Sequence, residues 1–323
     1  MDENSDRPRV FKGMPRRVFR YKDSDALAAD ARKSPYYWWW KYLRLSKDYW
    51  FACVKHGIVD DPRLKGMYAD FRDVFTVSFD EWWGRRGVVL FAERVALPAV
   101  RSIDPDDMRL SRGTDQHLLL ELPLHLTERT LISQVRKLLR EHPNREVKRR
   151  SSALRPLAQL KGIRQDVIET AHAVVQSHYL SRDTTREYKS GQVQGTKSLY
   201  QIGKELRLVR TCMPAVTDGP ERTREKVNGM KVAVARMLAR GSNLTEQAAV
   251  GVFPSAKKLS EPVQWREGSK RGLQRAVDQG YWRPLFDDAD TLSIDRMPPP
   301  EQRSVVRNDS PGGHVRSDGK NDT

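Results

Sequence analysis

Five consecutive aromatic residues, at positions 36–40, constrain the fold of this chain more than any other feature. Successive residues of an α-helix step around its axis by about 100°, so one helix cannot turn all five side chains toward a single core. Either several elements pack around the run, or part of it is a contact surface for a partner protein or for nucleic-acid bases. Six of the eight tryptophans lie between positions 38 and 83, which favours a small helical unit with an aromatic core. We expect Tyr36 or Trp38 to stay partly exposed or to bridge to the rest of the chain.

Helix-start and helix-stop residues divide this aromatic unit into short elements. Ser34 followed by proline begins a helix that should end before Gly57, either unbroken or interrupted near position 45. Ser78 opens a capping box for a helix that carries Trp82 and Trp83. The other elements expected here are short helices at 23–32 and 64–71 and a short strand at 88–91.

The formal charge of +16 is the strongest signal in the composition. It favours an anionic partner, with nucleic acid ahead of an acidic lipid surface; the alternative is a charge that serves solubility. Residues 295–323 are neutral, with five basic against five acidic side chains, so the excess lies in the folded part. Residues 129–164 hold eleven basic against two acidic side chains, which is the clustering that a phosphate-binding face needs.

Several classes of protein are disfavoured by absent patterns. No apolar stretch approaches the roughly 18 residues of a membrane span, and the N-terminal residues lack the apolar segment of a secretory signal. Cys53 and Cys212 are isolated, so they provide neither a disulfide framework nor a paired-cysteine metal site. A reducing cytoplasm is the simplest setting, and no cofactor is expected.

The expected organisation has two folded parts. Residues 1–33 form a flexible basic arm, 34–93 the aromatic-rich helical domain, 94–115 a linker, 116–290 a basic helical domain, and 291–323 a disordered tail. The second domain should contain a strand at 117–124 that contributes to a short strand pair, then helices at 127–141 and 163–180. The predicted fold class is therefore mainly α, with a small amount of strand.

Residues 198–240 are the segment most similar to a DNA-recognition module. Ser198 would cap a first helix, and Gly203 would sit where a second helix, at 222–240, packs closely against it. The connection between the helices, residues 208–220, is longer than the usual three or four residues. The segment is thus a winged or elaborated helix-turn-helix, or an ordinary helical pair with a solvated basic face. The candidate nucleic-acid-binding residues are Arg136, Lys137, Arg140, Arg145, Lys148, Arg149, Arg150, Arg222, Arg224, Lys226, Asn228, Lys231, Arg236 and Arg240.

The sequence contains no convincing catalytic constellation. His142 and Arg145 match the His-x-x-Arg element of tyrosine recombinases, with His172 and Tyr179 further along, but the context of an active-site arginine is missing. We interpret these residues as a helix end and a basic loop. Acidic pairs such as Asp287 and Asp288 are interpreted as turn or tail charges.

The string KSPYYWWW at 33–40, with residues 68–74 and the tryptophan pair at 82–83, resembles a group of poorly characterised bacterial proteins carried on plasmids and integrative elements. The resemblance covers mainly residues 33–92 and extends more weakly over 199–254. It implies an accessory role in a mobile element, such as replication control, transcriptional regulation or element maintenance.

Three functions follow from these patterns. The leading hypothesis is a regulatory DNA-binding protein, with double-stranded DNA as its partner. The first alternative is a protein-interaction or scaffold component of a mobile-element or defence system, with a protein partner or a second copy of the chain. The second is a binder of single strands or RNA, which would stack bases on Trp265, Tyr281 and Trp282.

Overall fold

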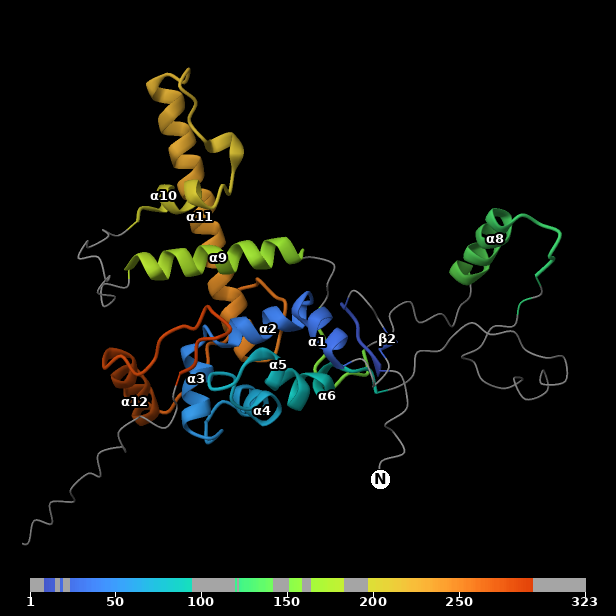
Figure 1. Cartoon of the computed structure of the whole chain (residues 1–323), viewed down its shortest axis with the longest axis horizontal. Helices are drawn as coiled ribbons and strands as arrows, with labels where there is room; N and C mark the ends of the chain where they lie inside the picture. Colours follow the sequence, from blue (N-terminus) through green and yellow to red (C-terminus); the bar gives the residue numbers. More distant parts are fainter. Residues whose placement is uncertain are drawn as a thin grey trace, which may run out of the picture.

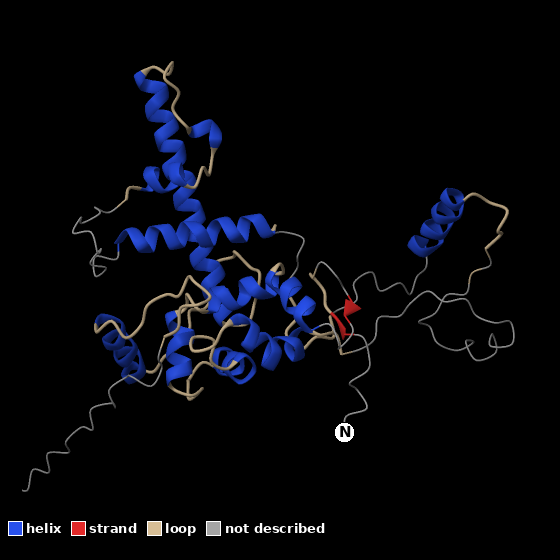
Figure 2. Ribbon diagram, viewed as in Figure 1, coloured by secondary structure: helices blue, strands red, loops and turns tan. Residues whose placement is uncertain are grey.

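The protein is mainly helical (Figures 1 and 2). The structure is a computed structural model, and it describes residues 9–14, 18–19, 24–94, 120, 122–141, 151–158, 164–182 and 197–292. Within these ranges the only strands are β1 (Arg9–Val10) and β2 (Val18–Phe19), which pair antiparallel with Arg9 opposite Phe19. They lie in the expected arm and not in the second domain. Residues 122–124 carry no strand, and most of the remainder of the predicted strand at 117–124 is outside the described residues.

The aromatic unit consists of short helices, several of which are capped at their first turn by a side chain. The Oγ atoms of Ser34, Ser46 and Ser78 accept hydrogen bonds from backbone N–H groups at the starts of three of them, as the cap prediction required for Ser34 and Ser78. The predicted interruption near position 45 is confirmed. The elements are α1 (Ser24–Arg32), α2 (Pro35–Leu43), α3 (Lys47–Val54), α4 (Pro62–Phe71), α5 (Phe79–Trp82), the π-helical turn η1 (Trp83–Gly87) and α6 (Val88–Phe91).

The strand predicted at 88–91 is wrong, because these residues continue the helix that begins at Phe79. Val88, Leu90 and Phe91 are all buried, whereas an alternating strand would bury every second residue. A run of four apolar residues has no distinctive period, so the sequence alone could not separate the two conformations.

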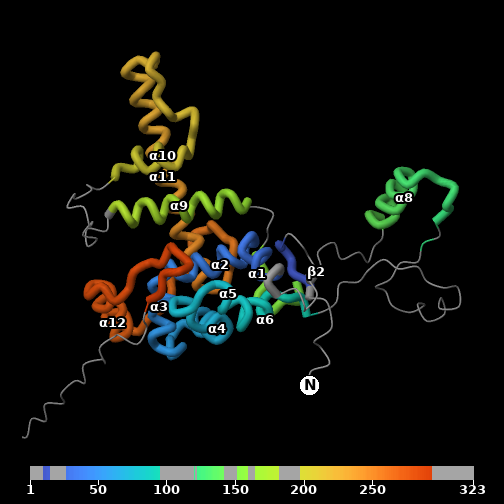
Figure 3. Tube along the Cα trace, in the orientation of Figure 1, coloured from blue at the N-terminus to red at the C-terminus, as the bar shows by residue number. Residues whose placement is uncertain are grey.

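The second half is built around one long helix, α11 (Pro220–Ala249). In Figure 1 α9 (Gln165–Arg182) runs across α11, and α10 (Leu199–Glu205) packs beside it; the carboxyl-terminal end of α11 enters the aromatic unit next to α2. Figure 3 shows the same path in the Cα trace. The other elements are α8 (Glu128–Glu141), the 3₁₀ turn η3 (Arg210–Cys212) and α12 (Glu267–Asp278).

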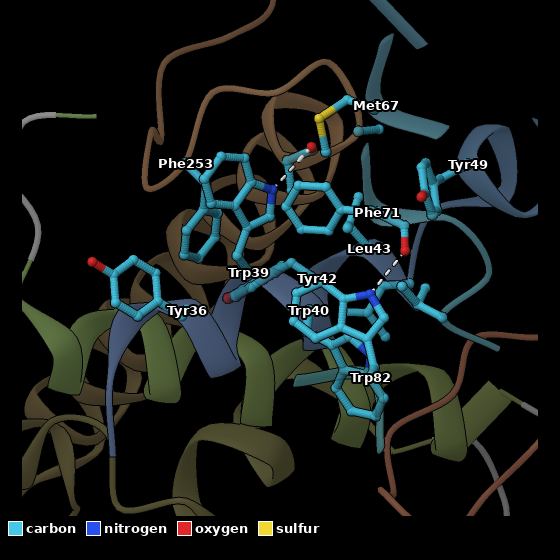
Figure 4. Packing of buried hydrophobic residues seen from close by; sticks show 14 of the residues in the cluster. Tyr36, Trp39, Trp40, Tyr42, Leu43, Tyr49, Met67, Phe71, Trp82 and Phe253 are labelled. Atoms are coloured by element: carbon cyan, nitrogen blue, oxygen red, sulfur yellow. Dashed lines mark hydrogen bonds between the residues drawn. The ribbon is translucent and has the colours of Figure 1, made fainter. Parts of the chain in front are cut away.

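The aromatic run lies in the core, as predicted. The side chains of Trp39 and Trp40 are fully buried, and the Trp39 indole N–H donates to the carbonyl oxygen of Ala248 on α11 at 3.2 Å (Figure 4). Trp38 stays partly exposed, as expected. Tyr36 does not: it is 2% exposed, stacks on Phe91 with ring centroids 4.3 Å apart, and donates its hydroxyl to the carbonyl of Lys12.

This core includes residues from both sides of the predicted linker, which itself lies outside the described ranges. Ile168 of α9, Leu244 and Ala248 of α11, and Leu285 are fully or almost fully buried in the same cluster as Trp39. Phe11, from the arm expected to have little fixed structure, is also completely buried there. A smaller cluster joins α9, α10 and α11 through Val174, Ile202 and Val234. The division into two independently folding domains remains a prediction.

Residues 284–292 are held against α1 and α2 by polar contacts. The Arg44 guanidinium is buried, lies 4.3 Å from the centroid of the Trp40 ring, and donates to the carbonyl oxygens of Asp287, at 2.9 Å, and Asp290. Burial lowers the pKa of Arg44 to about 10, so the side chain stays charged at neutral pH. Asp288 accepts from the Tyr37 hydroxyl at 2.8 Å and from Arg32 at 2.7 Å. Asp287 and Asp288 are therefore part of a tertiary contact and are not free tail charges.

The crossing of α9 and α11 depends on the absence of a side chain at Gly241. A Cβ atom there would lie 2.4 Å from Val175 Cγ2 and 3.3 Å from the carbonyl oxygen of Ala171. We expect Gly241→Val to lower the free energy of unfolding by about 1–3 kcal/mol through overpacking, although glycine itself is a poor helix former. Urea denaturation measures this change.

The matched control is Gly268→Ala in α12, where an added Cβ meets no atom within 4 Å. This substitution should stabilise by up to about 1 kcal/mol through helix propensity. A Gly241→Val variant as stable as the unaltered protein would show that α9 does not pack on α11 in this way.

Candidate nucleic-acid interface

α10, the first helix of the segment at 198–240, has the predicted serine cap and packs against α11. Ser198 Oγ accepts from the Gln201 N–H at 3.3 Å, and Gln201 Oε1 accepts from the Ser198 N–H at 2.7 Å, which forms a complete capping box. Gly203 is the point of closest approach to α11, because a Cβ there would lie 2.5 Å from Met230 Cγ and 2.8 Å from Val234 Cγ2. α10 and α11 therefore approach closely at Gly203.

The connection between α10 and α11 is long but anchored. Asp218 accepts from the Ala215 N–H at 2.6 Å and from the Lys226 ammonium at 2.5 Å, and Arg222 lies 3.4 Å from its other oxygen. The hydrogen bond from Lys226 lowers the pKa of Asp218, so the carboxylate stays ionised at neutral pH. This ion-pair group fixes the loop against the first two turns of α11.

Together these elements form a projecting unit. We call residues 197–240 the protrusion: it comprises α10, the connecting segment and most of α11. In Figure 1 its end extends away from α1–α6, and α9 crosses α11 below it. Its described cations are therefore presented at a distance from the aromatic core.

The predicted binding residues on α11 divide into two groups. Arg222, Arg224, Asn228, Lys231 and Arg236 are exposed. Lys226 is occupied by Asp218, and its side chain is 19% exposed. Arg240 is half-buried and contacts the sulfur of Met237. Lys226 and Arg240 thus support the protrusion and do not belong to its exposed face.

Three exposed cations were missed by the sequence reasoning. Lys204 lies on α10, and Arg207 and Arg210 lie on the connecting segment; all three are exposed. The sequence showed these charges, but the loop was treated as a departure from the helix-turn-helix pattern and not as a surface in its own right.

The basic cluster at 129–164 does not form one face among the described residues. Arg136, Lys137 and Arg140 are exposed on α8, which has no buried residue and no extensive contact with another described element. Arg145, Lys148, Arg149 and Arg150 lie outside the described residues. Arg155 instead donates to Asp70 of α4 at 2.5 Å and is partly buried. Clustering along the sequence was therefore not evidence of a shared surface.

The carboxyl-terminal aromatics fold back on the core. Trp265 packs edge-on against Phe51, with centroids 5.2 Å apart, and its indole N–H donates to Asp48 at 2.8 Å. Tyr281 and Trp282 are partly buried against the same cluster. These contacts with the core partly cover the rings on which a single-strand binder would stack bases.

Of the residues compared with the recombinase element, His172 lies in the core. His172 is 3% exposed, with the rings of Trp38, Tyr42 and Phe286 around it at centroid distances of 5.4–5.7 Å. Burial and the nearby Lys41 lower its pKa to about 3, so the imidazole is neutral. His142 and Arg145 lie outside the described residues. In the part of the chain that the structure covers, no three histidine, cysteine or acidic side chains are grouped to hold a metal ion.

No helix within the described ranges has the length and apolar character needed to cross a membrane. Comparison with known protein families, with curated protein sequences and with solved structures finds no match to this chain.

Proposed function

We propose that the protein binds double-stranded DNA through the protrusion. The observation that carries the proposal is a set of exposed cations that form no ion pair with any residue that the structure describes: Lys204, Arg207, Arg210, Arg224, Lys231 and Arg236. Two acids of the protrusion, Glu205 and Asp218, are paired with Lys197 and Lys226. The other two, Glu221 and Glu225, lie in the first two turns of α11. The remaining cations repel one another until an anionic partner supplies the opposite charge.

The finer assignment is part of the same proposal. We assign α10 and α11 as an elaborated helix-turn-helix-like pair, in which the anchored segment 206–219 replaces the usual short turn. The role is regulatory or accessory to a bacterial mobile element, which rests on the resemblance of residues 33–92. The cations of α8 provide further phosphate contacts if the flanking residues bring α8 to the same duplex.

The test is a triple substitution in the protrusion, Arg224→Ala with Lys231→Ala and Arg236→Ala. Affinity for a mixed-sequence duplex about three helical turns long should fall at least tenfold, measured by fluorescence anisotropy. The slope of log affinity against log salt should become shallower by about 0.9 for each lost phosphate contact. Single-stranded DNA and RNA of the same length, measured in parallel, should bind more weakly than the duplex.

The matched control removes the same charge from α12 and the segment before it, through Lys257→Ala with Lys258→Ala and Lys270→Ala, at cations that also form no ion pair with any described residue. These three side chains are also exposed. An equal loss of affinity in both triple variants would show that duplex binding depends on the net charge of the protein and not on the protrusion. No duplex binding at low salt would reject the proposal and leave the protein-interaction alternative.

A further inference from the structure

We infer that α11 lies in the major groove of duplex DNA, with Asn228 directed at the base edges. This inference deepens the proposed function and rests on it. It begins from the exposed face of α11, where Asn228, Val232, Ala235 and Ala239 follow one another at helical spacing and are all exposed. These four residues, called the central strip, carry no charge and have short side chains.

The central strip lies opposite the helices that support α11. Met230, Val234 and Gly241 point to the other side, where they meet α10 and α9. At about 100° per residue, these three positions are roughly 130–170° around the axis from the middle of the strip. One side of α11 is therefore fixed to the rest of the protein, and the strip is left free to contact a partner.

Cations border the central strip on both sides. The same helical geometry places Arg224 and Lys231 about 60° to one side of the strip and Arg236 about 70° to the other. Arg222, about 110° to the side of Arg236, lies 3.4 Å from Asp218 and belongs to the ion-pair group that anchors the loop. From residue 226 to residue 245 the helix contains no acidic side chain. The acids of this exposed face, Glu221 and Glu225, lie nearer the amino-terminal end of α11, so the contact is expected to centre on residues 228–239.

This arrangement fits a groove between two rows of phosphates. The major groove is about 12 Å wide and admits an α-helix, and short side chains along the centre allow the helix to approach the base edges. Cations on both borders can then reach the phosphates of the two strands. A second copy of the chain is a poorer occupant of this face, because its cations would meet these with the same sign.

Asn228 is the one side chain of the strip that can form hydrogen bonds. Its amide can pair with N6 and N7 of adenine, and Val232, one turn further, can contact a thymine methyl group. We therefore assign Asn228 as a specificity-determining residue, with a preference for an A·T pair at one position of the bound site.

The experiment compares duplexes of identical sequence that contain either cytosine or glucosylated 5-hydroxymethylcytosine, whose glucose fills the major groove. The full chain should bind the unmodified duplex and lose at least tenfold in affinity on the glucosylated one. Equal affinity for both would overturn the groove assignment while leaving DNA binding itself intact. No binding to the unmodified duplex would instead reject the proposed function, and this inference with it.

The role of Asn228 is tested by selecting bound sequences from a randomised duplex pool with Asn228→Ala. Affinity for the unselected pool should change less than threefold, whereas the preference at one A·T position should fall about tenfold. Gln279→Ala, which removes an exposed amide outside α11, should leave the selected sequences unchanged. If Asn228→Ala selects the same sequences as the unaltered protein, Asn228 does not determine specificity.

Discussion

Replacing Trp39 by alanine is expected to lower the free energy of unfolding by about 3–5 kcal/mol, the largest loss among the substitutions considered. The indole is completely buried and lies against Phe71, Phe91 and Phe253, with centroid distances of 5.2–5.7 Å. Alanine would leave a cavity among rings that cannot close over it, and it would leave the Ala248 carbonyl without its indole donor. Chemical denaturation followed by circular dichroism measures the loss.

Trp39→Phe separates the two contributions. It retains an aromatic ring but removes the hydrogen bond to Ala248, and should cost clearly less than Trp39→Ala. Val89→Ala, at a side chain that is 58% exposed on the neighbouring α6, should change stability by less than about 1 kcal/mol. A loss below about 1 kcal/mol for Trp39→Ala would contradict the placement of this residue at the centre of the core.

Acidification is expected to destabilise the protein through His172. Burial and Lys41 lower the folded-state pKa of this imidazole to about 3, whereas the ordinary value is about 6.5. The unfolded chain therefore takes up the proton first as pH falls below about 6.5. Stability contributed by the neutral ring is fully present above that pH and declines by about 1.4 kcal/mol per pH unit as pH falls from about 6.5 toward 3.

The measurement is the free energy of unfolding in urea at several pH values between 7 and 5. Asp288 and Lys41 also face this site, so the comparison is made between the unaltered protein and His172→Gln at each pH. The variant should lose about 2 kcal/mol less than the unaltered protein over this range. His125→Gln, at an exposed histidine, should follow the unaltered protein. If the free energy of unfolding falls equally with pH in His172→Gln and in the unaltered protein, the His172 ring is not buried in the neutral form.

Features set by neighbouring residues were predictable from the sequence. The serine caps at 34, 78 and 198, the interruption before α3 and the close approach at Gly203 each depend on a few adjacent residues with strong local preferences. The exposed cations of α11 were also identifiable, because the apolar spacing of a helix indicates which face is buried.

Features set by distant residues were not predictable in the same way. No sequence pattern indicated that Arg44 would be buried against residues 287–290, that Arg155 would pair with Asp70, or that Phe11 would enter the core. The contacts of Arg44 and Arg155 join segments between 85 and 246 residues apart, and the burial of Phe11 depends on the completed core, so no local preference reports them. The same limit made charge clustering along the sequence a poor guide to a binding face.

The packing of Trp39 against α11 imposes a time order on folding as the chain is synthesised. Its hydrogen-bond acceptor, Ala248, lies 209 residues further along. At synthesis rates of about 5–20 residues per second, the aromatic segment waits roughly 10–40 s for this partner. During that interval a nascent chain carries tryptophan and tyrosine surface that α11 does not yet cover. The residues that form the dense core of the finished protein are therefore an aggregation-prone surface until synthesis has reached α11.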